Sequence, residues 1–255
     1  MAHIHPSDTE LDFLRECTAE ELEPIVGAIL GTTGEGDDKA IDTSGRLSSE
    51  LDSTESFKRH YPNHTKYVDE IIAEIQTYGG NAIANSIRGY GVPYREVLVD
   101  VAKKLKVNFA KTAKTTHIET CLLNKLIEDS FEKLSDDQKV ALAEAVGGAN
   151  VPAGGLTSAA LIFLVRQGGF RSYQIMLILV NALAKVILGH GLWWTTNIAL
   201  CRAMAFLSGP VGWLLTGGWT VIDLLGPAYR VTIPAVLYIS MLRKVKEGQK
   251  AGYTV

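Results

Sequence analysis

The feature that most constrains this chain is the lack of charge in long stretches of its last 105 residues. Four uncharged runs cover residues 172–184, 186–201, 203–222 and 231–242. Such a run cannot form a surface helix with one polar face, so it is either buried all round in a helical bundle or placed in a membrane. Only residues 203–222 reach the roughly 20 residues that cross a bilayer. Glycine and proline pairs within that run make its insertion marginal, and both alternatives stay open.

Charge also divides the chain into two unlike parts. Residues 1–150 carry a formal charge of −10, whereas residues 151–255 carry +7. An acidic first part argues against nucleic acid as a partner, because phosphate binding depends on clustered lysine and arginine. The spaced basic residues of the second part favour anionic lipid headgroups or an acidic partner. Neutralisation of one part by the other across an internal interface is the alternative.

The first part has the apolar periodicity of helices. Ser7 with Glu10, Thr18 with Glu21, and Thr116 with Glu119 each fit a capping box, and Pro93 suits the first turn of another helix. Pro24 predicts a break or kink before it, within the helix that follows Thr18. No run of alternating β-branched residues competes with the helical pattern. The sequence therefore predicts an all-α chain, a multi-helix bundle with a small N-terminal helical element and an apolar, glycine-rich C-terminal helical module.

Composition predicts four segments along the chain. Residues 1–30 form the N-terminal helical element, and residues 31–56, rich in Gly, Ser, Thr and Asp, form a poorly ordered linker that proteases cut first. Residues 57–150 form an acidic helical domain. Residues 151–255 form the apolar, basic helical module, for which membrane interaction is one option.

The cysteines indicate the compartment. Cys17, Cys121 and Cys201 are odd in number, widely spaced and without a CxxC motif, and the chain begins with polar and acidic residues. These features are typical of a reducing compartment and of a chain without a signal peptide. We expect a cytoplasmic location, with a peripheral position on the inner face of the cytoplasmic membrane as the alternative.

One acidic residue stands alone among the apolar runs. Asp223 is the sole acid between residues 151 and 246 and directly follows the longest run. A buried carboxylate is costly unless it is paired, and Arg202 and Arg230 are the candidate partners. The pair is either a structural ion pair or a latch that opens when the apolar module is released.

A second candidate is the loop at residues 89–95, which precedes the helix that begins near Pro93. Backbone amides at such a helix start could hold an anion, with Arg88 and Arg95 beside Gly89 and Gly91. The alternative is a turn shaped for close helix packing. The sequence lacks the Walker, GxGxxG and GxSxG patterns, so it predicts no nucleotide site and no catalytic residue.

Two pairs of side chains, one of two histidines and one of a histidine and a cysteine, have the spacing of metal ligands on a helix. His60 and His64 are four residues apart, but Pro62 between them favours a surface turn. His117 and Cys121 have the same spacing without a second ligand pair, which favours packing of Cys121 in the core. The sequence therefore predicts no metal and no cofactor.

Five strings of residues resemble the YaaW-like family of uncharacterised bacterial proteins. They are ELDFLREC (10–17), YPNHTKYVDE (61–70), GYGVPYRE (89–96), GGFRSYQ (168–174) and GPAYRVTIP (226–234). The family is remotely grouped with the ubiquinol–cytochrome c chaperones, helical proteins that assist assembly of a membrane respiratory complex. The resemblance implies a helical, membrane-proximal assistant and assigns no catalytic residue.

These observations favour a non-enzymatic helical interaction or assembly protein, chaperone-like, that acts at a membrane or on an apolar client. Its partners would be membrane lipid or an apolar protein, with a homo-oligomer as a further option. One alternative is a membrane-active or pore-forming effector that is stored as a soluble bundle and exposes residues 186–222. The other is an enzyme of unknown reaction, supported by the loop at 89–95.

Overall fold

The computed structural model describes residues 3–31, 50–79, 89–132, 134–147, 157–188 and 227–253. Within these ranges the chain is helical, and the β-structure is limited to an isolated bridge between His3 and Tyr90. The predicted all-α class is confirmed. The elements are η1 Asp12–Glu16, α1 Ala19–Leu30, η3 Leu51–Ser53, α2 Glu55–His60, η4 His64–Tyr67, α3 Val68–Tyr78, α5 Tyr94–Lys104, α6 Thr115–Phe131, α7 Asp136–Gly147, α8 Ser158–Gln167, α9 Gly169–Leu188 and α11 Pro227–Lys250.

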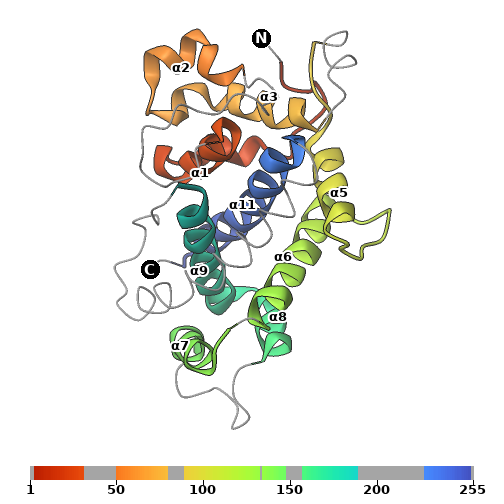
Figure 1. Cartoon of the computed structure of the whole chain (residues 1–255), viewed down its shortest axis with the longest axis vertical. Coiled ribbons are helices and arrows are strands. Elements are labelled where there is room, and N and C mark those ends of the chain that lie inside the picture. The colour runs from red at the N-terminus through yellow and green to blue at the C-terminus, as the bar shows by residue number, and fades with distance from the viewer. Residues whose placement is uncertain are drawn as a thin grey trace.

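Helix α11 is the centre of the bundle. It packs against α1, α3, α5, α6 and α9 (Figure 1), and every residue from Thr232 to Leu242 is buried. This segment is the uncharged run at 231–242. Neighbouring helices surround it on all sides, which explains why no side of it is charged. Of the two alternatives for this run, burial in a helical bundle is therefore the one that the structure shows.

Helix α9 gives a second apolar run the same explanation. It packs most extensively against α11. From Ser172 to Asn181 all its residues are buried except Gln174, which is half-buried. Beyond Leu188 the runs at 186–201 and 203–222 lie outside the described residues. Among the helices that the structure describes, none combines the length and the hydropathy of a membrane-crossing segment.

Helix α1 begins where the sequence predicts. Thr18 accepts a hydrogen bond from the Glu21 amide (3.2 Å), and the Glu21 carboxylate accepts one from the Thr18 amide (2.8 Å), so this capping box is confirmed. Of the break or kink predicted before Pro24, the break is wrong, because α1 runs without interruption from Ala19 to Leu30. Leu22, Ile25 and other residues of the same helix are fully buried, and their packing keeps the helix continuous through the proline.

Two further predictions about helix starts are wrong. The Ser7 hydroxyl lies 3.2 Å from Nδ1 of His5 and no helix starts there; the next element, η1, begins at Asp12. Helix α6 begins at Thr115 without a side-chain cap, because the Glu119 carboxylate turns into the core instead of back to the helix start. A capping box is a local pattern, and here tertiary contacts decide where the side chains go.

The predicted linker ends earlier than residue 56. Leu51 is buried within η3, and the Thr54 hydroxyl caps α2 by accepting from the Phe57 amide (3.2 Å). Residues 32–49 lie outside the described part of the chain. The division into four segments stays a prediction, and the described helices on both sides of residue 150 contribute to one apolar core.

Candidate functional site

The most elaborate group of polar side chains lies where α5, α6 and α11 meet. Glu119 of α6 is fully buried, accepts a hydrogen bond from the Tyr94 hydroxyl (2.9 Å) and forms an ion pair with Arg243 of α11 (2.8 Å). Arg243 also donates to the carbonyl of Glu10 (2.8 Å), and its guanidinium lies 4.3 Å from the centre of the Phe13 ring. One arginine therefore joins the last helix to α6 and to the N-terminal segment.

The N-terminal segment adds two carboxylates to this group. Asp8 accepts hydrogen bonds from the side chain of Gln76 and from the backbone amide of Tyr94, both at 2.7 Å. Glu10 accepts one from the Thr115 hydroxyl (2.7 Å). Asp8 thus caps the start of α5 from far away in the sequence. Predicting this contact from the sequence was not possible, because the two residues are 86 positions apart.

Burial sets the protonation of these groups. It raises the pKa of the Glu119 carboxyl, although Arg243 opposes the shift, and it raises the pKa of Tyr94 well above its usual value. The nearby Cys17 thiol is buried, which raises its pKa to about 12 and keeps it protonated. A protonated thiol is a poor nucleophile. We conclude that this group fastens helices together.

A pocket of a different kind lies at the other end of the molecule, under α7. It encloses about 30 Å³ and is almost wholly apolar. The hydroxyl of Ser130 lies in its wall, buried and without a hydrogen-bond partner among the described residues. The lining side chains come from α6 to α9: Ile127, Ser130, Phe131, Leu134, Leu142, Leu161, Ile175, Ile178 and Leu179.

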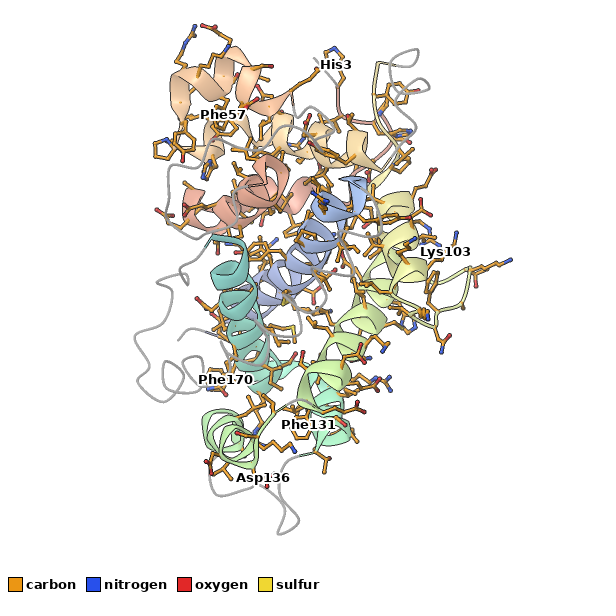
Figure 2. The ribbon with its side chains drawn as sticks, viewed as in Figure 1. His3, Phe57, Lys103, Phe131, Asp136 and Phe170 are labelled. Atoms are coloured by element: carbon orange, nitrogen blue, oxygen red, sulfur yellow. The ribbon has the colours of Figure 1, made fainter. Side chains whose placement is uncertain are left out.

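Exposed apolar side chains gather at this same end. Val140 of α7, Phe163 of α8 and Phe170 of α9 are 57%, 59% and 44% exposed. Figure 2 shows Phe131, Asp136 and Phe170 together beside α7, far from His3 and Phe57. We call the pocket together with Val140, Phe163 and Phe170 the apolar end. Each of these three side chains stands on a helix that also contributes to the wall of the pocket.

The structure places only part of the predicted Asp223 pair. Asp223 and Arg202 lie outside the described residues. Arg230 is described and exposed in the first turns of α11. Whether the three form an ion pair or a latch stays a prediction.

The loop at 89–95 is a close packing contact. A methyl group on Gly91 would lie 2.2 Å from the carbonyl of Gln76, and the Val92 amide donates to that carbonyl (3.1 Å). Gly89 has a φ of +76°, and Arg95 donates to the carbonyl of Lys111 (2.9 Å). Arg88 lies outside the described residues. These contacts support the alternative in which the glycines serve helix packing, and the anion site stays a prediction.

The two pairs with metal-ligand spacing, His60 with His64 and His117 with Cys121, lie in different surroundings. The prediction of a surface turn is wrong for His64, which is buried 2.5 Å from the Tyr67 hydroxyl because η4 turns it inward; His60 is half-buried. Cys121 is half-buried, with its sulfur 3.7 Å from Nε2 of His117. The described residues contain no group of three or more metal-ligating side chains.

Two charged interior residues that we did not predict as site residues do have a signal in the sequence. Glu119 lies on the apolar face of its helix, three residues before Leu122 and four before Leu123, which is a reason to expect it to be buried. Arg243 directly follows the run at 231–242. Phe163 and Phe170 carry no such signal, because an exposed phenylalanine and a core phenylalanine look alike in a sequence.

Comparison with known proteins identifies relatives along almost the whole chain. A UPF0174 protein of Helicobacter pylori (strain J99) is 41% identical over 239 residues, which cover 92% of this chain and 91% of that protein. A second from the same strain is 36% identical and is covered over 98% of its length. The UPF0174 protein YaaW of Escherichia coli (strain K12) is 35% identical over 94% of this chain and 95% of its own.

No family model and no solved structure matches the chain.

Proposed function

The chain belongs to the UPF0174 family, and from that premise we propose that it is a non-enzymatic interaction or assembly protein that binds an apolar partner through its apolar end. The observation that carries the proposal is the pocket under α7 with exposed phenylalanines of α8 and α9 close by. Charged side chains in the interior of the described part of the chain form ion pairs with one another, and these pairs hold helices together.

The size of the pocket indicates what it accepts. About 30 Å³ holds one or two water molecules or the end of one apolar side chain. Water is disfavoured there, because a buried water needs two to four polar partners and the wall offers the Ser130 hydroxyl. The pocket therefore fits an apolar group inserted from a partner, with a polar atom that bonds to Ser130.

The energetics favour a reversible contact. Each phenylalanine is about half exposed, so covering both contributes roughly 2–3 kcal/mol. Association itself costs about 4 kcal/mol or more in lost translational and rotational freedom. The rings alone are therefore insufficient, and binding requires the pocket or charged groups as well.

Cell fractionation tests the proposal. The wild type is expected to sediment with membranes or with a discrete client complex. Phe163→Ser with Phe170→Ser should move it to the free fraction without changing its melting temperature. Tyr61→Ser is the matched control, because Tyr61 is also 59% exposed but lies next to α2 at the opposite end. If the double variant fractionates like the wild type, the apolar end is not the binding surface.

The resemblance to ubiquinol–cytochrome c chaperones is compatible with this proposal, since those helical proteins assist assembly at a membrane. A membrane-active effector differs in one measurable way, because it would release dye from sealed vesicles. An enzyme would require a ligand at Arg88 and Arg95. Neither alternative has a supporting contact among the described residues.

A further inference from the structure

The corner between α8 and α9 combines exposed aromatic rings with free arginines. We define this α8–α9 corner as residues 163–171. Within the described residues, neither Arg166 nor Arg171 has a hydrogen bond, an ion pair or a ring contact. The other described arginines each have an interaction: Arg15 with Asp12 and Asp69, Arg59 with Glu55, Arg95 with Lys111, Arg243 with Glu119, and Arg230 with a further group.

Helix geometry places Phe163 beside Arg166, and a short turn joins them to Phe170 and Arg171. Phe163 and Arg166 are three residues apart on α8, so they lie on the same face, and that face is exposed. Gly168 and Gly169 follow with φ of +71° and +79°, backbone angles that favour glycine and let the chain reverse at once into α9. Phe170 and Arg171 open α9. The Phe170 ring meets the Tyr253 ring edge-on at 6.0 Å, which holds it beside the corner.

The local charge is one-sided. The sequence from Thr157 to Leu188 contains three basic residues and no aspartate or glutamate. The neighbouring helices do contribute acids, but Asp129 of α6 is paired with Lys125 (2.5 Å), and Asp136 of α7 with Lys139 (3.7 Å). Glu128 on α6, Glu132 just after it and Asp137 on α7 are exposed. The corner itself therefore presents positive charge beside apolar rings.

We propose that the α8–α9 corner docks on an anionic membrane surface, with Arg166 and Arg171 on phospholipid phosphates and Phe163 and Phe170 at the level of the acyl chains. This inference rests on the proposed function and names its partner as lipid. Arginine suits phosphate because its planar guanidinium donates two parallel hydrogen bonds. Aromatic rings between basic residues are typical of segments that lie in the headgroup region.

Vesicle co-sedimentation of the full chain tests the proposal. Vesicles of phosphatidylcholine alone are compared with vesicles of phosphatidylcholine mixed with phosphatidylglycerol. We expect binding to the mixed vesicles only, weakened by added salt. Arg166→Gln with Arg171→Gln should lower the partition coefficient about 30-fold, because each basic residue near an anionic surface contributes about five-fold. Phe163→Ser with Phe170→Ser should lower it as well.

The matched control is Lys58→Gln with Arg59→Gln. It removes the same charge from an exposed helix, α2, at the opposite end of the molecule, so general electrostatic attraction would fall equally in both double variants. Equal loss in the two variants, or binding to both kinds of vesicle alike, overturns the lipid inference. Absence of vesicle binding overturns it too. The proposed function is judged separately by fractionation, where a protein client complex that depends on Phe163 and Phe170 would still support it.

Discussion

At the scale of single residues, the buried pair of Glu119 and Arg243 does most to hold distant parts of the chain together. Glu119 is fully buried and Arg243 is 12% exposed, so both charges have left water. Their mutual attraction and the Tyr94 hydroxyl offset that cost. Arg243 also donates a hydrogen bond to the Glu10 carbonyl, so the pair fixes the N-terminal segment against the helices that carry Glu119 and Arg243.

Removing one partner of this pair should destabilise the fold strongly. Arg243→Met leaves the Glu119 carboxylate buried without its counter-charge, which costs about 3–5 kcal/mol. Urea unfolding followed by circular dichroism measures the loss. Arg59→Met removes an exposed ion pair with Glu55 and should cost about 0.5 kcal/mol or less. Equal effects of the two substitutions would contradict a buried network.

A double substitution separates charge from packing. Glu119→Leu combined with Arg243→Met removes both charges and keeps the volume similar, so it should be more stable than Arg243→Met alone. If the double variant is less stable than the single one, packing around Arg243 rather than its charge holds the helices.

His64 predicts a dependence of stability on pH. Burial lowers its pKa from 6.5 to about 4, so between these values the unfolded chain binds a proton that the folded chain does not. The stability that neutral, buried His64 contributes is fully present above pH 6.5, decreases as the pH falls, and is lost below about pH 4. We expect wild type to lose roughly 3 kcal/mol more than His64→Gln over that range.

Unfolding free energies measured across this pH range check the His64 prediction. His117→Gln serves as the control, because it removes a histidine that is exposed on α6. Parallel pH profiles for wild type and His64→Gln would show that His64 does not titrate in the unfolding transition.

At the scale of elements, the join between α3 and α5 depends on a glycine. Gly91 lies against the backbone of Gln76, which is part of α3, and the Val92 amide bonds to the same carbonyl. Asp8 then caps α5 from the N-terminal segment. Helix start and helix packing are thus set by three separate parts of the chain.

Substitution of Gly91 should therefore be costly. In Gly91→Ala the new methyl group meets backbone atoms, which cannot rotate away, so we expect a loss of about 3 kcal/mol. Gly89→Asn should cost less than about 1 kcal/mol, because no atom of the described residues lies within 4 Å of a Cβ placed there and asparagine tolerates a positive φ. Thermal unfolding of both variants checks this. A harmless Gly91→Ala would show that α3 and α5 do not need this contact.

At the scale of the whole molecule, stability is distributed unevenly between the centre and the apolar end. Helix α11 is surrounded by five other helices, whereas α7 packs mainly on α9. Figure 1 shows α7 at the margin of the bundle. The apolar end, to which we assign binding, thus includes a helix at the margin of the bundle, as expected for a surface that adapts to a partner.

Native-state hydrogen exchange should separate these two regions. We expect amides of α11 from Thr232 to Leu242 to exchange only through global unfolding, and amides of α7 to exchange through a local opening of lower free energy. Exchange of α11 at lower denaturant than α7 would contradict the central position of α11, and would favour a release of the apolar helices instead.

The sequence by itself determined the helical class and several helix boundaries. The capping box of Thr18 and Glu21 and the start of α5 near Pro93 are as predicted. The equally local boxes at Ser7 and Thr116 fail, because tertiary contacts take their side chains elsewhere. The uncharged runs also limited the fold to two environments. For residues 232–242 burial in the bundle is the outcome.

The tertiary structure alone decided which polar residues are buried and which apolar ones are exposed. Glu119 fits a capping pattern, yet it pairs with a residue 124 positions away, and Asp8 caps a helix 86 positions away. Phe163 carries no sequence signal for exposure, yet it stands in solvent. A side chain's surroundings are set by helices that come together from distant parts of the chain. Local periodicity carries no information about those partners.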